Sequence, residues 1–379
     1  MLDRLIDDEI APRASEIDRT GCFPGDLYLR LGDLGLLGLW TPPEHGGSGP
    51  DPVTPLLIAE RLARASVALA VTYSNCGDCI APILAGGSER VKRTWLGVLC
   101  SGEVVPAFCL SEPAGGSDVA TLTTTAVRDG DHYVVTGRKA WITSAPVASL
   151  FVVFARTDPT AGHRGISAFV VPREVRGLVV GQPEDLLGLR GSPTAEVAFD
   201  EVRVPIDARL GGEGDGFGLA MTTLDESRLA IAAVSLGAAT AAIDRAVTYA
   251  RERVQFGRPI IEHQGLQFRL SELATELAMC RSLWQTAVAV LVGQGGRQAG
   301  VYAAMAKLAA SDLAMTAAIE AAQVLGASGL TRGSGVERLI RDCKALQIFE
   351  GTNEIQKWLI GRRLQKDGLR LCEIDEPWL

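Results

Sequence analysis

The stretch QIFEGTNEIQ at residues 347–356 places a carboxylate, Glu350, directly after an apolar run and directly before a Gly-Thr-Asn break. Apolar residues at three- and four-residue spacing predict a helix that ends here, and Asn353 followed by Gln356 predicts the start of the next helix. A carboxylate at such a corner, behind Phe349, is partly shielded from water, which would raise its pKa and suit it to proton abstraction. A solvated acid at a helix end is the alternative, and this segment alone slightly favours it.

The segment CLSEPAGGSDVA at residues 109–120 combines a turn, a glycine pair and hydroxyl groups. It leaves a β-like run and reaches Gly115 and Gly116, with Ser111 and Ser117 on either flank. Such a bare backbone can bring its N–H groups close to a phosphate or to a planar ring. An ordinary glycine-serine turn is the alternative and the more common structure.

The segment GRKAWITS at residues 137–144 is typical of a strand, in which side chains two residues apart share a face. Trp141 and Thr143 could then present an indole and a hydroxyl to one flat ligand. A core tryptophan beside a strand threonine is the alternative, and it leads on this segment alone.

Three arginines gather in RERVQFGRPIIEHQ at residues 251–264, between two helical patterns. Arg251, Arg253 and Arg258 could grip a pyrophosphate in an otherwise acidic protein. Arginine near a helix C-terminus also complements the helix dipole without any ligand, and this alternative stays open.

The elements that must position these segments follow from residue type and spacing. Apolar residues at helical spacing predict an N-terminal α-helical domain over residues 1–103. Short runs rich in Val, Phe, Thr and Ile predict a central antiparallel β domain over 104–214, with a hairpin at Asp129-Gly130. Long alanine-rich patterns predict a C-terminal helical bundle over 215–379. The fold class is therefore α+β with several domains, and the bundle helices are expected at 220–253, 264–293, 299–326, 335–349 and 353–366.

Composition argues against several classes of function. The 379 residues carry a formal net charge of −8 without a run of five or six like charges, which gives no support to nucleic-acid or membrane-surface binding. The acidic start does not resemble a secretory signal, and no apolar run reaches the roughly 18 residues of a membrane-spanning helix. We therefore expect a soluble cytoplasmic protein.

Cysteine and histidine usage predicts neither a disulfide scaffold nor a metal site. Eight cysteines are too dilute for the former, and Cys76 and Cys79 form a lone CxxC with none of the four histidines near it. A redox dithiol is one alternative, but two small residues on a buried helix face are favoured.

Taken together and in this order, six segments resemble the motif series of the acyl-CoA dehydrogenase family over residues 10–365. They are CLSEPAGGSD, WITS, TLDESR, RERVQFGRPIIEHQ, QVLGASG and QIFEGTNEIQ. The central and C-terminal thirds look most like the short-chain and short branched-chain members. The resemblance implies an N-terminal helical domain, a central β-barrel-like domain and a C-terminal four-helix bundle. It also implies a homotetramer with one FAD per subunit, bound between β domain and bundle.

The resemblance gives Glu350 the role of the catalytic base. It would remove the α-proton of an acyl-CoA thioester while hydride leaves the β-carbon for flavin N5, giving a trans-2-enoyl thioester. The developing enolate oxygen must be stabilised, which the family does with the base's own backbone N–H and a ribityl hydroxyl of FAD. A small residue at Gly351 lets backbone, thioester and flavin stack closely.

The same resemblance assigns the binding residues. Ser111 would bond the pyrimidine end of the flavin, Thr143 would address N5 and Trp141 would pack beside the ring. The positions that match FAD contacts are Phe108, Leu110, Ser111, Gly116, Ser117, Trp141, Thr143, Arg253, Gln264, Gln323, Gly326, Ala327, Thr352 and Glu354. The positions that match substrate contacts are Ser117, Asp225, Arg228 and Gly351.

Two departures from the family pattern concern the cofactor. Ser111 stands where threonine is usual but keeps the hydroxyl, and Ala327 stands where glycine is frequent, which weakens that assignment. The expected electron acceptor is electron-transferring flavoprotein. An acyl-CoA oxidase or an acyl-carrier-protein dehydrogenase on the same scaffold is an alternative, and so is a non-catalytic acyl-thioester-binding module, although the latter would need no base.

Overall fold

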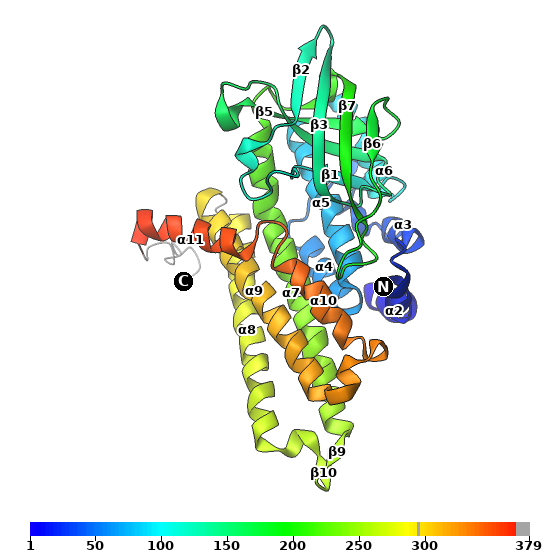
Figure 1. The fold of residues 1–379 in the computed structure, drawn as a ribbon, viewed down its shortest axis with the longest axis vertical. Coiled ribbons are helices and arrows are strands. Elements are labelled where there is room, and N and C mark those ends of the chain that lie inside the picture. The colour runs from blue at the N-terminus through cyan, green and yellow to red at the C-terminus, as the bar shows by residue number, and fades with distance from the viewer. Residues whose placement is uncertain (294–295, 369–379) are drawn as a thin grey trace. The chain divides into compact units, whose positions relative to one another are not determined.

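The computed structural model describes residues 1–293 and 296–368 and divides into two compact units, Met1–Ser227 and Arg228–Leu379 (Figure 1). The first unit contains helices followed by a β-sheet, and the second is mainly helical, which confirms the predicted order of helices, sheet and helices. Helix α7 (Gly216–Glu252) crosses the boundary between the units. The finer division at residues 103/104 and 214/215 remains a prediction.

The helices of the first unit form where apolar residues recur at helical spacing. The helical stretch that starts at Leu2 ends at Gly21, whose φ of 71° suits a residue without a Cβ. In the most apolar helix, α5, the Ser66 hydroxyl caps the N-terminus by accepting from the Leu69 N–H at 3.3 Å. The helices are α1 (Leu2–Arg4), α2 (Ala14–Thr20), α3 (Gly25–Asp33), α4 (Thr54–Ala65), α5 (Val67–Gly86) and α6 (Glu89–Cys100), with further helical turns at Leu5–Ile10, Ala11–Arg13, Leu36–Gly38 and Pro43–His45.

The predicted hairpin at Asp129-Gly130 is confirmed. Strands β2 and β3 pair antiparallel with Asp129 opposite His132, and Gly130 has the positive φ of 61° that the tight turn requires. The strands are β1 (Pro106–Cys109), β2 (Thr125–Asp129), β3 (His132–Thr143), β4 (Leu150–Arg156), β5 (Ile166–Pro172), β6 (Leu178–Val180), β7 (Thr194–Pro205) and β8 (Arg209–Leu210).

The sheet is open and mixed, which corrects the expectation of an antiparallel, barrel-like domain. Its order is β6-β7-β3-β2-β4-β5-β8, so β6 and β8 lie at opposite ends instead of closing a barrel. Strand β1 pairs parallel with β4, and β2 meets β4 in one further parallel pair. Short apolar runs identify strands but do not specify their direction, because side-chain alternation is the same in both arrangements.

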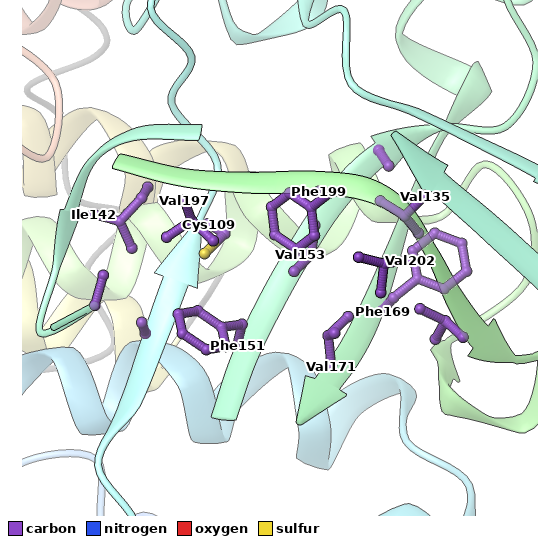
Figure 2. Close-up of a cluster of buried hydrophobic side chains, with 14 of the residues drawn as sticks. Cys109, Val135, Ile142, Phe151, Val153, Phe169, Val171, Val197, Phe199 and Val202 are labelled. Atoms are coloured by element: carbon purple, nitrogen blue, oxygen red, sulfur yellow. The ribbon is translucent and has the colours of Figure 1, made fainter. Parts of the chain in front are cut away.

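The core of the sheet is built by alternate side chains of neighbouring strands. Phe151 of β4, Phe169 of β5 and Phe199 of β7 lie in one buried cluster, which Figure 2 shows together with Cys109 at the end of β1. The segment that follows Cys109 therefore leaves a strand whose last residue is fixed in the core.

The second unit is organised around helix α9, against which α8, α10 and α11 pack. All five predicted helices are present, with ends within a few residues of expectation. Alanine at the buried positions of α9, such as Ala304 and Ala310, lets neighbouring helices approach closely. The elements besides α7 are α8 (Gln264–Gly293), α9 (Gly296–Leu325), α10 (Val336–Leu346), α11 (Asn353–Asp367) and a small hairpin of β9 (Val254–Gln255) and β10 (Arg258–Pro259).

Within the part of the chain that the structure describes, three helical stretches are long and apolar enough to cross a membrane, judged by length and composition alone, which corrects the expectation of none. They are Val67–Gly86, Gly216–Glu252 and Gln298–Leu330, and 89%, 83% and 44% of their most apolar windows is buried inside the protein. For the first two, the apolar surface is used in packing. Alanine and glycine keep these helices apolar on average even though polar residues interrupt every run.

Candidate active site

The loop after β1 is fixed to β3 by main-chain hydrogen bonds. The Ala140 N–H donates to the Ser111 carbonyl at 3.0 Å, and Glu112 and Gly115 exchange N–H···O bonds of 3.1 and 3.0 Å. The turn brings Gly116 close to Ser111, since a Cβ at Gly116 would lie 3.6 Å from the Ser111 Oγ. Ser111 is half-buried, whereas Gly116 is exposed. A hydroxyl and a bare backbone are therefore presented together, as the glycine-serine pattern predicted.

A buried ion pair fixes the same loop from beneath. Lys139 Nζ lies 2.9 Å from Glu112 Oε1 and donates to the Leu110 carbonyl at 3.1 Å, and both charged side chains are buried. Burial alone would raise the pKa of Glu112, but the Lys139 ammonium and the hydrogen bonds from Thr123 and Thr124 lower it to about 2. Burial lowers the pKa of Lys139, and Glu112 opposes that shift. Strand and loop are thus held together by a charged contact that water does not reach.

Trp141 lies at an irregularity in β3. The β3–β7 register shifts between Lys139 and Ile142, and Trp141 takes a positive φ of 61° with 63% of its surface exposed. A positive φ is strained for a bulky residue and occurs mainly where function requires it. Ile142 is buried and Thr143 half-buried, so an exposed indole and a hydroxyl follow each other along the strand end. Simple strand alternation did not predict the bulge that exposes the indole.

Two further residues of the predicted flavin site lie on β1 and beside it. The Phe108 ring packs against the Phe154 ring in a tilted arrangement with a centroid distance of 4.8 Å, and Leu110 is buried. Their contacts position the loop. Ser117, also predicted here, is exposed at the end of the same loop.

In the second unit, Glu350 lies at a sharp corner between α10 and α11. Glu350 and Gly351 have consecutive positive φ values of 53° and 87°, and both residues are half-buried. The Thr352 hydroxyl accepts from the Ile355 N–H at 3.2 Å, so Thr352 caps α11. Helix α11 begins at Asn353, as predicted, and the Asn353 side chain is buried and bonded to Lys307.

Buried donors hold the carbonyl groups of this corner. Gln356 Nε2 donates to the carbonyls of Gly351 at 2.8 Å and Glu350 at 3.3 Å, and Lys307 Nζ donates to the Gly351 carbonyl at 3.0 Å. Lys307 also donates to Asn353 Oδ1 at 2.9 Å. The side chains of Lys307 and Gln356 are fully buried. The main chain of the corner is therefore held in place by side chains from the protein interior.

The Lys307 ammonium also interacts electrostatically with the carboxylates near the corner. Burial lowers the pKa of Lys307 to about 8, while the nearby Glu350 and Asp312 carboxylates oppose the shift. Asp312 in turn accepts from Asn353 Nδ2 at 2.7 Å and from Gln347 Nε2 at 2.6 Å. Carboxylates, amides and one ammonium thus form a connected network around the turn.

The predicted arginine cluster lies at the end of α7 and in the β9–β10 hairpin. Arg253 and Gln264 are exposed, and Arg258 hydrogen-bonds His263 Nδ1 at 3.2 Å. At the hairpin tip, Phe256 is 94% exposed with a positive φ of 52°. These side chains are directed to solvent in this single chain.

The remaining predicted residues occupy three other places. Gln323 and Ala327 are exposed around the end of α9, where Gly326 takes a φ of 59°. In α7, Asp225 belongs to the first unit and is half-buried, and Arg228 of the second unit is buried. The predicted residues of the second unit are therefore spread over α7, the hairpin region, the end of α9 and the Glu350 corner, whereas those of the first unit concentrate at the β1 loop and β3. Glu354 is exposed in the first turn of α11.

Comparison with known families covers almost the entire chain. Models of the N-terminal, middle and C-terminal domains of acyl-CoA dehydrogenase match residues 1–103, 107–202 and 214–365. The chain belongs to the acyl-CoA dehydrogenase family. The relatives in this family are flavin-dependent oxidoreductases, so the resemblance read from the motifs is confirmed.

Individual acyl-CoA dehydrogenases are similar to this chain over most of their length. The mitochondrial short-chain specific acyl-CoA dehydrogenase of Bos taurus is 41% identical over 94% of this chain and 87% of its own. The structure of butyryl-CoA dehydrogenase from Megasphaera elsdenii has a TM-score of 0.93 at 36% identity, covering 96% of each chain. A structure from a study of the electron transferring flavoprotein of Acidaminococcus fermentans has a TM-score of 0.93 at 38% identity, covering 97% of this chain and 96% of the other.

Three charged side chains that support the site were missed in the sequence: Glu112, Lys139 and Lys307. The Glu112–Lys139 pair joins residues 27 positions apart, and Lys307 lies 46 positions before its partner Asn353. A signal for Lys307 was present, since a lysine interrupts the small apolar residues around it in AAMAKLAAS. A charge on a helix that is otherwise apolar on all faces indicates a buried partner.

The cysteine pair takes no part in the site. Cys76 and Cys79 are fully buried on α5, which confirms the favoured position on a buried helix face. Burial also raises the pKa of the Cys76 thiol to about 12, so this thiol stays protonated at neutral pH. Within residues 1–293 and 296–368, no three His, Cys, Asp or Glu side chains are grouped as metal ligands.

Proposed function

We propose that this family member catalyses FAD-dependent α,β-dehydrogenation of a short straight or branched acyl-CoA to the trans-2-enoyl thioester, with Glu350 as the base. The observation that supports this most strongly is the Glu350 corner. A half-buried carboxylate stands on a strained turn whose carbonyls are held inward by buried donors. Such a turn fixes the position of the Glu350 side chain and the direction of its main-chain groups. A solvated acid at a helix end would not need these contacts.

The residues present in the first unit fit a flavin. An exposed indole at Trp141 offers a flat apolar surface, and the Ser111 and Thr143 hydroxyls with the bare backbone at Gly116 offer hydrogen-bonding groups beside it. In the second unit, Thr352, Glu354, Arg253, Gln264, Gln323, Gly326 and Ala327 are proposed to hold other parts of FAD. When bound, FAD supplies an acceptor for the hydride that leaves the substrate β-carbon.

The chain's own part in the reaction is to take a proton and stabilise charge. Glu350 accepts the α-proton and becomes a carboxylic acid, and the electron pair of the C–H bond forms the new C=C bond as hydride leaves. Because charge develops on the thioester oxygen, the main-chain N–H of Glu350 is proposed to donate to it. Gly351 leaves room for the thioester because it has no Cβ. Ser117, Asp225 and Arg228 are proposed to bind other parts of the substrate.

Substrate, acceptor and assembly follow from the relatives and the sequence. A short acyl chain is proposed because the chain resembles short-chain specific and butyryl-CoA dehydrogenases throughout. Electron-transferring flavoprotein is proposed as the acceptor, which the similar structure from a study of that flavoprotein supports. A cytoplasmic homotetramer is proposed from the family resemblance.

An anaerobic titration tests the function. The purified yellow protein is titrated with acyl-CoAs from short to long, straight and branched, while the visible flavin band is followed. Butyryl-CoA or a short branched analogue should bleach it, and Glu350→Gln should bind the same thioester and bleach at least about a thousandfold more slowly. A Glu350→Gln variant that bleaches at the wild-type rate contradicts the assignment of the base.

Glu272→Gln serves as the matched control, because it neutralises an exposed carboxylate on α8 of the same unit that has no proposed role in binding or catalysis. It should retain wild-type bleaching if the effect belongs to Glu350 alone and not to a general loss of negative charge. Bleaching by acyl-carrier thioesters but not by any acyl-CoA would overturn the proposed substrate while keeping the chemistry.

A further inference from the structure

A lysine is buried directly behind the corner that carries Glu350. Lys307 lies on α9 among the buried alanines Ala304, Ala306 and Ala310, and its side chain has no exposed surface. An ammonium group loses its hydration when it is buried, which strongly disfavours this arrangement unless hydrogen bonds and opposite charges compensate. The contacts of Lys307 therefore indicate what its charge is for.

Those contacts point to the turn between α10 and α11. Lys307 Nζ donates to the Gly351 carbonyl at 3.0 Å and to Asn353 Oδ1 at 2.9 Å. Asn353 Nδ2 in turn donates a hydrogen bond to Ser311 Oγ of α9 at 3.0 Å. One side chain thus joins the residue after Glu350 and the first residue of α11 to the central helix of the unit.

The charged groups that act on Lys307 lie at the Glu350 corner and on α9, α11 and α7. Glu350 and Glu354 of the corner and Asp312 of α9 favour the ammonium form, and Arg228 of α7 disfavours it together with burial. Electrostatic interaction between two groups acts on both. The ammonium that Glu350 stabilises therefore favours the ionised form of Glu350, which is the form that can accept a proton.

The backbone that Lys307 holds is strained. Glu350 and Gly351 both take left-handed φ values, 53° and 87°, and such conformations persist only where surrounding contacts enforce them. A charge-assisted hydrogen bond to the Gly351 carbonyl is stronger than a neutral one and is suited to this task.

We propose that Lys307 is a positioning residue for the dehydrogenation: its buried ammonium holds the Gly351 carbonyl and thereby fixes the direction of the Glu350 main chain and carboxylate. The inference rests on the proposed function for the role of Glu350 as the base. Lys307 itself is not proposed to touch the reacting atoms.

The kinetic test uses the flavin-loaded enzyme and butyryl-CoA in anaerobic rapid mixing from pH 6 to pH 9.5. Lys307→Met keeps the length and apolar stem of the side chain and removes its charge and donors. Its limiting bleaching rate should fall about a hundredfold, the usual scale for a misplaced catalytic group, with a flavin-to-protein ratio and apparent Kd near wild type. Lys307→Arg should recover part of the rate, because it restores charge and donors.

The pH profile separates positioning from a general loss of stability. In the wild type the rate should decline as Lys307 loses its proton, near pH 8. In Lys307→Met this alkaline decline should be absent, and the acidic limb should move to higher pH because the carboxylate has lost a neighbouring positive charge. Lys357→Met, which removes an exposed ammonium from α11, is the control and should match the wild type.

A substrate-free measurement keeps the proposal testable if the proposed function fails. Hydrogen–deuterium exchange in the peptide spanning residues 347–356 should be faster in Lys307→Met than in the wild type, with unchanged exchange in β4 and β5. Wild-type exchange in that peptide, or bleaching within about twofold of wild type, would overturn the proposal. If Lys307→Met does not fold, two other measurements decide: the same exchange comparison made with Lys307→Arg, and the alkaline decline of the wild-type rate. If neither effect is found, the proposal is overturned. If Glu350→Gln instead bleaches at the wild-type rate, Glu350 is not the base. The exchange result would still test whether Lys307 holds the corner.

Discussion

At the scale of single residues, the corner between α10 and α11 depends on a glycine that the sequence identified for another reason. The resemblance implied that Gly351 makes room for the ligand. The structure adds a second requirement on the protein side, since a Cβ at Gly351 would lie 2.6 Å from Gln356 Nε2. The φ of 87° is a further obstacle to any side chain.

Gly351→Ala should therefore destabilise the protein and the corner together. The new Cβ must displace the Gln356 amide, which holds the carbonyls of Glu350 and Gly351, and it must adopt a left-handed φ. We expect a loss of about 1–3 kcal/mol in the free energy of unfolding, measured by denaturant titration of the flavin-loaded protein.

Gly361→Ala, in the helix that follows the corner, is the matched control. Gly361 lies inside α11, and an added Cβ would meet no described atom within 4 Å outside the neighbouring helix backbone, so alanine should stabilise the protein by about 0.5–1 kcal/mol through helix propensity. Equal effects of the two substitutions would mean that the Glu350 corner is not strained as described.

At the scale of elements, the β1 loop and β3 are joined by the Glu112–Lys139 pair. Because the pKa of Glu112 falls from its ordinary value of 4.5 to about 2 on folding, the pair contributes stability that is present above pH 4.5 and lost as the pH falls toward 2. This contribution to the free energy of unfolding depends on both partners. If one of them is removed, the other is left buried without a group that compensates its charge.

Glu112→Gln should cost about 3–5 kcal/mol of unfolding free energy at neutral pH, because it leaves the buried Lys139 ammonium without its counterion. The double variant Glu112→Gln/Lys139→Met should recover part of this loss and should show a shallower decline in stability below pH 4.5 than the wild type. Urea titrations from pH 3 to pH 7 give both quantities. A double variant less stable than Glu112→Gln, or an unchanged acid decline, would show that the pair does not act as described.

The elements also show which parts of the site the sequence could predict. The hairpin at Gly130 and the helix that ends before Glu350 follow from local residue patterns, and both are present. The start of α11 at Asn353 was also predicted, but its cap by Thr352 and the tertiary contact of Asn353 with Lys307 were not. The bulge at Trp141 was missed as well, since it exists only relative to β7. Local spacing predicts elements, whereas contacts between distant segments decide register, caps and bulges.

At the scale of the whole molecule, the exposed hairpin region around Arg253 contrasts with the buried surroundings of Glu350. Arg253 and Gln264 are exposed, and Phe256 at the hairpin tip is almost completely so. An exposed aromatic side chain with neighbouring arginines is typical of a surface that is covered by a ligand or another chain. The proposal that these residues hold part of FAD in a homotetramer accounts for both features.

If Arg253 holds an FAD phosphate, Arg253→Ala should lower the flavin-to-protein ratio after gel filtration. The apparent FAD dissociation constant should rise about tenfold, because one charge-assisted contact is lost. Arg332→Ala, which removes another exposed arginine from the same unit, should retain the wild-type ratio. Light scattering on the same samples reports the assembly, and loss of flavin from an intact tetramer would place Arg253 at the cofactor. Loss of both together would indicate that Arg253 acts on assembly first, because a cofactor site shared between subunits cannot persist in a monomer. A full flavin ratio in Arg253→Ala would contradict the assignment and leave the helix dipole of α7 as the reason for an arginine at this position.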